Sequence, residues 1–253
     1  MGLATGASAI PSLQLDIVGG VWDAATQTVI AQGDSFQVYA YLIPDGSATL
    51  STASGPTSYY ISAALMPRTT PPGGSLGSFS FDSTTVNVTA DMYYGSPPLE
   101  AYLAYDPHDL SPHGIFETYF SEFSFTFDPA NLANAYNVQD TTGAGPTTYS
   151  GTGASMYYQA FNVNVAGLAD GYGIHFDLYN ETIVSSRVCT GSGRTQTCTY
   201  TSTGDIDRNA FAPYSHDAQS GTRREVTEPS SLAVAGLGLL AVGFATRRLR
   251  HRS

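Results

Sequence analysis

The C-terminal part of the chain holds a run of 17 residues without a charge, from Ser230 to Thr246. As a helix that rises about 1.5 Å per residue, this run reaches roughly 25 Å, near the short limit for crossing a hydrocarbon core of about 30 Å. The sequence therefore predicts a transmembrane helix over residues 230–246 and a cytoplasmic tail over 247–253. Four arginines of that tail are expected to hold it in the cytoplasm: Arg247, Arg248, Arg250 and Arg252.

The same run has two other interpretations, a plain C-terminal anchor and a buried core helix of a globular domain. The core helix is the poorer of the two. Three glycines weaken a soluble helix here, and the arginine cluster follows at once: Gly236, Gly238 and Gly243.

A short polar signature precedes the apolar run, within a linker over residues 222–229. Signature, apolar helix and Arg-rich end together resemble the PEP-CTERM sorting tail of bacterial exopolysaccharide-producing species. The signature of that family is Pro-Glu-Pro. Glu228 and Pro229 match it, and Thr227 replaces the first proline. The resemblance implies that an exosortase, a membrane protease, reads and cuts this tail while the protein is anchored in the inner membrane.

Charge is divided unevenly between the tail and the rest of the chain. Residues 1–222 hold 4 arginines and 19 acidic residues, a formal charge of −15, whereas residues 223–253 hold 6 arginines and 2 glutamates, or +4. An acidic exported region disfavours nucleic acid as a partner, because phosphates require a basic face. Abundant Tyr and Phe (17 and 12) argue against disorder and supply material for a core.

The N-terminal residues 1–11 resemble the end of a secretory signal peptide. Ala7-Ser8-Ala9 fits the small-x-small cleavage pattern, but a basic segment and an apolar segment before it are missing. We expect a true start upstream of Met1, with another export route or an ordinary flexible N-terminus as alternatives.

Residues 12–221 contain about ten short segments in which apolar and polar residues alternate, separated by Gly-, Pro- and Ser-rich turns. The clearest lie at residues 12–18, 35–43, 59–65, 116–127, 156–165 and 171–180. No convincing amphipathic helix precedes residue 230. The pattern predicts an all-β ectodomain, an antiparallel β-sandwich of jelly-roll type. It also predicts a half-buried first strand, a hairpin across residues 166–170 joining the last two segments, and an irregular region over 205–221.

Several stretches of the ectodomain resemble the choice-of-anchor N proteins. They are residues 13–23, residues 112–116 leading into 123–127, residues 175–180 and residues 211–221. That family shares one extracellular domain on different surface anchors and has no established activity. The resemblance implies surface display and supplies no catalytic residue.

The two cysteines, Cys189 and Cys198, flank a glycine turn at Gly191-Ser-Gly193. Two strands joined by this turn would place them opposite each other, so a structural disulfide is expected in an oxidising compartment. A zinc site would need two more ligands, and none is close in sequence.

Candidate metal ligands are few. Asp205, Asp207 and Asn209 have the spacing that opens a calcium loop, but Ala210 and His216 stand where such a loop needs Gly and Glu, so the alternative is a solvated acidic loop. His-Asp pairs occur at 108–109 and 216–217, His113 lies close to the first pair, and His175 lies in a predicted strand. None of these histidines has the spacing of a metal-binding motif. No cofactor is expected, and calcium at Asp205, Asp207 and Asn209 is the alternative.

Signals for catalysis are equally weak. No nucleophile or phosphate-binding motif is present. Asp177 and Glu122, both in predicted strands, are the pair that a jelly-roll hydrolase could use, at roughly 5–10 Å separation. The tyrosines that could line a sugar-binding face are equally expected on any half-buried sheet: Tyr93, Tyr94, Tyr102, Tyr105, Tyr157 and Tyr158.

The leading interpretation is an exported, non-enzymatic cell-surface or matrix protein, with its N-terminus outside and its C-terminus in the cytoplasm until processing. Exosortase and the inner membrane are its expected partners during sorting, and exopolysaccharide afterwards. The alternative is a carbohydrate-binding β-sandwich, with or without calcium.

Overall fold

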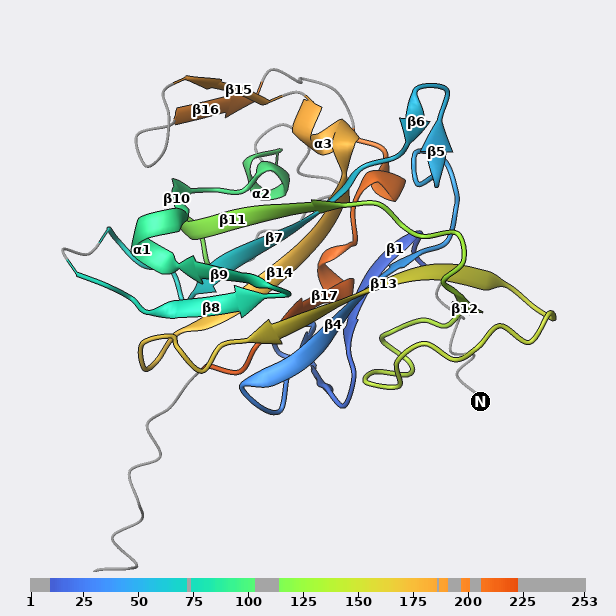
Figure 1. Cartoon of the computed structure of the whole chain (residues 1–253), viewed down its shortest axis with the longest axis horizontal. Helices are drawn as coiled ribbons and strands as arrows, with labels where there is room; N and C mark the ends of the chain where they lie inside the picture. Colours follow the sequence, from blue (N-terminus) through green and yellow to red (C-terminus); the bar gives the residue numbers. More distant parts are fainter. Residues whose placement is uncertain are drawn as a thin grey trace, which may run out of the picture. The chain divides into compact units, whose positions relative to one another are not determined.

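The structure is a computed structural model of the chain, and it describes residues 10–71, 74–102, 114–185, 187–190, 197–200 and 206–222. All of them belong to one compact unit, Met1–Arg223. The predicted all-β class is confirmed, because two large sheets stack as the layers of a sandwich (Figure 1). Within the described part no helix is long and apolar enough to cross a membrane; the predicted span over 230–246 lies outside it.

One layer is a six-stranded sheet in which every pair of neighbours is antiparallel. A short strand, β12, pairs with one end of its central strand, β13. In spatial order the sheet contains β1 (Leu13–Ile17), β4 (Ser35–Leu42), β13 (Ser155–Asn164), β8 (Ser78–Phe81) and β9 (Thr84–Asn87), with β12 (Leu132–Asn134) beside β13.

The other layer is a seven-stranded sheet. Its spatial order is β10 (Tyr93–Gly95), β11 (Thr118–Phe125), β7 (Tyr59–Met66), β14 (Gly173–Asn180), β17 (Asp217–Gln219), β3 (Thr28–Ile30) and β2 (Val21–Asp23). The purely antiparallel sandwich expected from the sequence is corrected here, because β17 runs parallel to β3. The jelly-roll connectivity stays a prediction.

Short elements complete the described part. Two small hairpins are β5 (Ser51–Thr52) with β6 (Gly55–Pro56), and β15 (Arg187–Thr190) with β16 (Thr197–Tyr200). The helices are α1 (Val88–Asp91), α2 (Pro98–Tyr102), α3 (Glu181–Ser185), and the 3-10 turns η2 (Arg208–Ala210) and η3 (Tyr214–His216). The chain passes directly from β9 into α1, and β10 and α2 follow before the longer strand β11.

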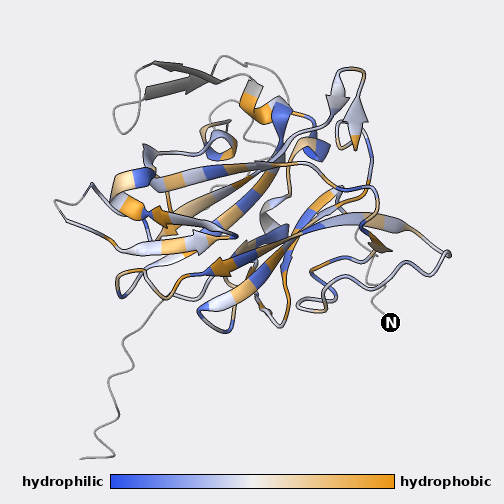
Figure 2. Ribbon diagram, in the orientation of Figure 1, coloured by the Kyte–Doolittle hydropathy of each residue, from blue (hydrophilic) through white to orange (hydrophobic). Residues whose placement is uncertain are grey.

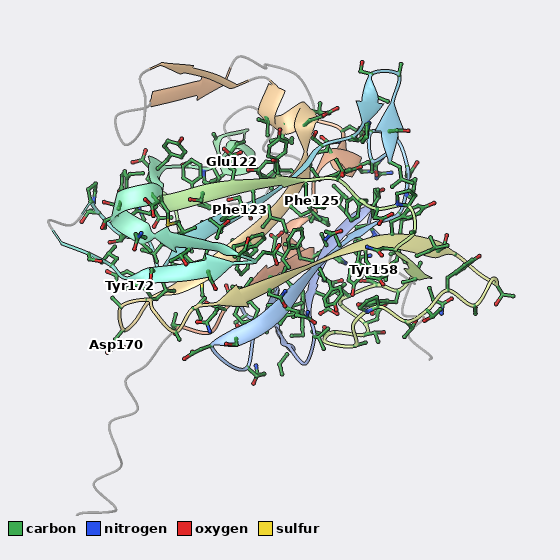
Figure 3. The ribbon with its side chains drawn as sticks, in the orientation of Figure 1. Glu122, Phe123, Phe125, Tyr158, Asp170 and Tyr172 are labelled. Carbon is green, nitrogen blue, oxygen red and sulfur yellow. The ribbon has the colours of Figure 1, made fainter. Side chains whose placement is uncertain are left out.

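Aromatic rings from both layers meet in the middle of the sandwich. Phe81 of β8 stacks on Phe123 of β11, with ring centroids 4.2 Å apart, and on Phe161 of β13 at 5.0 Å. Phe125 contacts Phe161 edge-on at 5.0 Å. Figure 3 shows Phe123 and Phe125 directed between the sheets, and Figure 2 shows the alternation of apolar and polar residues along the strands. Such contacts add to the burial of apolar area and fix the two sheets face to face.

The first strand departs from the half-buried pattern expected for residues 12–18, because all five residues of β1 are buried. Its outward-facing residues, Gln14 and Asp16, lie under the segment that follows β12. Asp16 accepts hydrogen bonds from the backbone N–H groups of Ile17 (2.8 Å) and Gly143 (2.9 Å) and from the Tyr136 hydroxyl (2.9 Å). Alternation predicts which face is polar, but not that a distant loop covers it.

The hairpin expected across residues 166–170 is wrong. β13 belongs to the six-stranded sheet and β14 to the seven-stranded one, so the connection passes from one layer to the other. Leu168 is buried at 1% exposure, and its backbone forms a bridge with Gly77. An apolar side chain in the middle of the loop enters the core, and this turns the chain across the sandwich instead of back along the same sheet.

The irregular region expected over 205–221 is also corrected, because it contains β17 in the interior of the seven-stranded sheet. The strand is only three residues long, and the sequence Asp-Ala-Gln has no apolar signal, although all three residues are buried. Through β17 the hairpin of β2 and β3 joins the rest of its sheet.

Asp16 makes the stability of the fold dependent on pH. Burial raises the pKa of its carboxyl, and the hydrogen bonds from Gly143, Tyr136 and Ile17 offset part of this effect. A carboxyl whose pKa is raised by folding stabilises the fold below its unfolded pKa of about 4, and this contribution is lost as pH rises through the folded pKa.

We therefore expect the wild-type protein to lose free energy of unfolding relative to Asp16→Asn between pH 4 and pH 7. Urea titrations at several pH values measure this, with Asp140→Asn, in an exposed position of the covering loop, as the control. A wild-type advantage that grows with pH would contradict the assignment.

Candidate functional site

Many residues singled out by the sequence lie outside the described part of the chain. These are the processing signature Thr227, Glu228 and Pro229, the cytoplasmic arginines Arg247, Arg248, Arg250 and Arg252, and the loop residues Tyr105, His108, Asp109, His113 and Asp205. The linker over 222–229 is described only at Thr222, and the signal-peptide remnant only at residues 10 and 11. Their predicted roles stay predictions.

The cysteine hairpin is described at the level of its backbone. β15 pairs antiparallel with β16, and the register places Cys189 opposite Cys198, as the turn predicted. The side chains lie outside the described part, so the disulfide stays a prediction.

Asp207 and Asn209 are the described members of the candidate calcium loop. They connect η2 to the loop after β4. Asp207 accepts hydrogen bonds from the backbone N–H groups of Asn209 (3.0 Å) and Ser47 (3.1 Å), which lower the pKa of its carboxyl. Asn209 Oδ1 accepts a hydrogen bond from Ser12 Oγ at 2.7 Å. Gly46 permits this approach: its φ is +51°, and a Cβ there would lie 2.5 Å from Asn209 Nδ2. Both side chains therefore serve to join loops.

His216 is buried at 3% exposure and lies between two polar partners. Its Nε2 is 2.8 Å from Asn137 Oδ1, and its Nδ1 is 2.9 Å from Ser215 Oγ. Because Asn137 Oδ1 is an acceptor, Nε2 is assigned the proton. Burial lowers the pKa of His216 to about 4, so the ring is neutral near pH 7. This histidine ties η3 to the loop after β12.

Glu122 and Asp177 lie on the same outer face of the seven-stranded sheet, with β7 between their strands. Ser62 of β7 is the register partner of both. Two inter-strand spacings of about 4.8 Å separate their backbones, within the range that a carboxylate pair needs. Their partners differ, however: Glu122 accepts a hydrogen bond from the Tyr179 hydroxyl (2.9 Å), whereas Asp177, at 1% exposure, lies 3.0 Å from His175 Nε2.

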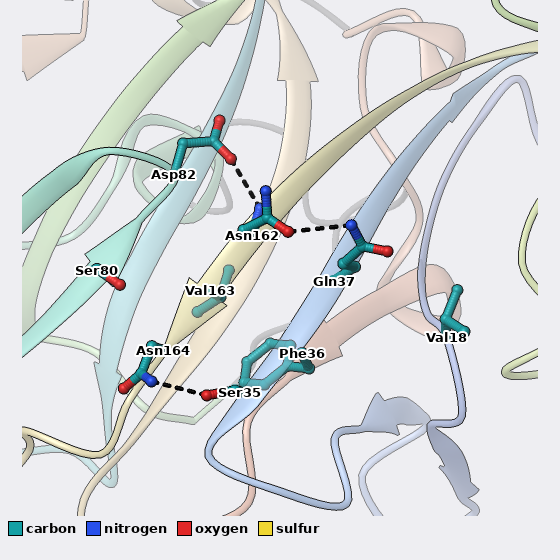
Figure 4. A pocket seen from close by; sticks show the side chains of 9 residues that line it. All are labelled: Val18, Ser35, Phe36, Gln37, Ser80, Asp82, Asn162, Val163 and Asn164. Atoms are coloured by element: carbon teal, nitrogen blue, oxygen red, sulfur yellow. Dashed lines mark hydrogen bonds between the residues drawn. The ribbon is translucent and has the colours of Figure 1, made fainter.

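A groove opens on the outer face of the six-stranded sheet, with a volume of about 450 Å³. A row of polar side chains crosses it, from Asp82 after β8, through Asn162 on β13, to Gln37 on β4 (Figure 4). Gln37 Nε2 donates to Asn162 Oδ1 at 3.0 Å, and the Asn162 backbone N–H donates to Asp82 Oδ1 at 2.8 Å. Beside this row Asn164 Nδ2 donates to Ser35 Oγ at 2.7 Å.

Aromatic residues extend this polar row along the same face. Tyr39 donates a hydrogen bond to Gln37 Oε1 at 3.2 Å, and its ring lies 6.0 Å from that of Tyr158. Amide groups carry both donors and acceptors, so exposed amides beside a half-exposed ring can bind hydroxyl-rich ligands. The sequence pointed to Tyr158 alone among these residues. The polar alternates of residues 35–43 and 156–165 were the signal that could have found the rest.

The other predicted tyrosines are not brought together with Tyr158. Tyr93 and Tyr94 lie on β10 of the other sheet, where Tyr93 is 37% exposed and Tyr94 donates to the carbonyl oxygen of Thr69 at 2.9 Å. Tyr157 precedes Tyr158 on β13, so its side chain lies on the opposite face of the sheet. The side chains of Tyr102 and Tyr105 lie outside the described part.

Comparison with protein families gives one match, the PEP-CTERM protein-sorting motif, over residues 225–248. The chain carries a PEP-CTERM sorting motif. The match includes the signature at 227–229, the apolar run and the first two arginines of the tail. This motif is typical of exosortase substrates, and it indicates an exported protein that is transiently anchored in the membrane by its C-terminus. No curated protein and no solved structure matches the chain.

Replacing Asp207 with Ala tests whether its hydrogen bonds stabilise the contact between η2 and the loop after β4. The change removes the acceptor for the backbone N–H of Asn209 in η2 and for that of Ser47 in the loop after β4. We therefore expect a loss of about 1 kcal/mol and a melting temperature lower by about 2–4 °C. The fall should be the same with millimolar calcium and with EGTA, as measured by thermal unfolding. Asp45→Ala, an exposed position in the adjoining loop, is the control. If calcium stabilises the wild-type protein and Asp207→Ala abolishes that effect, the residue is a calcium ligand instead.

Proposed function

We propose that the chain is a non-enzymatic surface or exopolysaccharide-matrix protein whose β-sandwich is the part displayed outside the cell. The sorting motif over residues 225–248 is the observation that carries this proposal. The arginines at 247, 248, 250 and 252 favour a cytoplasmic C-terminus, and the ectodomain is then delivered to the other side of the inner membrane. Cleavage near Thr227-Glu228-Pro229 releases the ectodomain, which becomes attached to the cell surface or to the matrix.

Two features of the ectodomain support display in place of catalysis. We infer that the ectodomain is of the choice-of-anchor N type, a family with no established activity. The described carboxylates that a hydrolase would need are not arranged across an open groove, because Asp177 is buried beside His175. Its strongly acidic character, −15 over residues 1–222, favours solubility outside the cell and disfavours anionic partners.

Processing of the tail can be tested by expressing the full chain in cells with and without an exosortase and locating the mature C-terminus by mass spectrometry. With the enzyme we expect a product that ends near residues 227–229; without it, an uncleaved chain in the membrane fraction. Glu228→Ala should reduce the cleaved fraction about tenfold or more, because it removes the charge of the signature, whereas Glu225→Ala, three residues earlier, should leave cleavage unchanged. An intact tail in the exported protein, with the exosortase present, would refute the proposal.

A second candidate function, carbohydrate binding, is favoured by the groove on the six-stranded sheet. Gln37, Asn162 and Asn164 expose amides, and Tyr39 and Tyr158 lie next to them. Amides can pair with sugar hydroxyls, and the rings can pack on the apolar faces of a sugar. The negative charge of the ectodomain favours a neutral polysaccharide. Calcium is not required for this arrangement, since the described side chains themselves supply the donors and acceptors.

Affinity electrophoresis of the full chain in detergent, in gels that contain neutral polysaccharides such as dextran, galactomannan or xyloglucan, tests this second function. We expect at least one polymer to retard the protein. Asn162→Ala and Tyr158→Ala should each weaken binding about tenfold, because a lost hydrogen bond or ring contact is worth about 1–1.5 kcal/mol. Tyr93→Ala, an exposed tyrosine of the other sheet, is the matched control. Equal retardation of all the variants would place binding away from the groove.

A further inference from the structure

Three potential metal ligands converge where β14 meets β17, on the outer face of the seven-stranded sheet. His175 and Asp177 are alternate residues of β14 and therefore point to the same side. The register pairs Phe176 with Ala218 and His175 with Gln219, which places Asp217 beside Asp177. One ligand atom from each of His175, Asp177 and Asp217 lies within 4.8 Å of the others, and the three side chains are 3%, 1% and 0% exposed.

A buried hydroxyl lies at the same level of the sheet, on the other side of Asp177. Ser62 of β7 is the register partner of Asp177, so both side chains lie on the same face about 5 Å apart. Ser62 is 0% exposed, and its Oγ has no hydrogen-bond partner among the described residues. A buried hydroxyl without a partner is costly, and a water molecule held by an ion at this place would supply one.

The donor set selects a class of ion. Calcium and magnesium take oxygen ligands, whereas one imidazole nitrogen with two carboxylates suits zinc and neighbouring divalent transition metals. Ligand atoms around a tetrahedral ion at about 2.0–2.1 Å are about 3.4 Å apart. The observed 3.0 Å between His175 Nε2 and Asp177 Oδ1 is close to this, and a ligand atom of Asp217 lies within 4.8 Å of both.

A cavity reaches one member of this cluster. It has a volume of about 250 Å³, and His175, Gln219 and Thr28 are among the residues that line it. An ion can therefore approach the cluster from the side of His175.

We propose that His175, Asp177 and Asp217 bind one divalent transition-metal ion of the zinc class, with the Ser62 hydroxyl hydrogen-bonded to a water molecule on it. A dication suits a buried site with two carboxylates and an imidazole, because these groups are its usual ligands. The ion joins β17 to β14. It thereby stabilises the strand through which β2 and β3 are attached to the sheet. The site is independent of the sorting tail and of the groove on the other sheet.

Metal binding can be tested on the full chain purified in detergent with a chelator and then dialysed. Zinc alone should bind at one ion per chain, measured by atomic emission, and excess zinc should raise the melting temperature by about 5 °C or more, whereas magnesium should not. Asp217→Asn and Asp177→Asn should weaken zinc binding at least tenfold, and Ser62→Ala about tenfold through loss of its contact with the bound water. Asp82→Asn, an exposed carboxylate of the other sheet, should bind zinc like the wild-type protein.

Two results would overturn the proposal. One is a wild-type protein that binds less than a tenth of an ion per chain in excess zinc, which would mean that the cluster is a purely structural His–Asp pair. The other is an unchanged dissociation constant in Asp217→Asn. If the Asn variants do not fold, X-ray absorption of the zinc-loaded wild-type protein decides. We expect nitrogen and oxygen ligands at about 2.0–2.1 Å including imidazole, and sulfur ligands or the absence of imidazole would place the ion elsewhere.

Discussion

Burial of β14 on both of its faces is the constraint on which the rest of the ectodomain depends. All eight of its residues are buried. Ile174, Phe176 and Leu178 belong to the core between the sheets, while His175, Asp177 and Tyr179 face the other way. A strand of this kind needs partners on both sides, so the outer face is covered by α3 and by the segment 206–211, which form an apolar cluster with Tyr179. Polar residues on a covered face need polar partners, and this explains the concentration of His, Asp and Ser there.

The outer faces of the two sheets differ in their chemistry. On the outer face of the six-stranded sheet, Gln37, Asn162 and Asn164 expose their amides in a groove, and Tyr39 and Tyr158 lie beside it. The outer face of the seven-stranded sheet is covered beside β14, and its polar residues there are buried and contact each other. A displayed domain can therefore have a recognition surface on one side and an internal stabilising cluster on the other. The sorting tail supplies delivery, and neither face is required for it.

Alternation predicted most strands to within a few residues, because a sandwich core imposes a period of two on strands such as β4, β7 and β11. It could not predict β17, whose Asp-Ala-Gln sequence is buried by neighbours that come from distant parts of the chain. It also assigned residues 166–170 to a hairpin, since only the position of Leu168 in the core distinguishes a crossing loop from a tight turn. The polar cluster was missed for the same reason: His175 and Asp177 were visible as strand residues, but their proximity to Asp217 depends on register. In contrast, the sorting motif is contiguous and could be recognised from sequence.

β17 also determines when the ectodomain can be completed during synthesis. The hairpin of β2 and β3, made near the start of the chain, reaches its sheet only through this strand near residue 218. The first part of the domain must therefore wait, with one strand edge open, until almost all of the region before the sorting motif has been made and exported. Exposed strand edges invite pairing with other chains. The fold is therefore completed late, when β17 covers the open edge of β3 and connects it to β14.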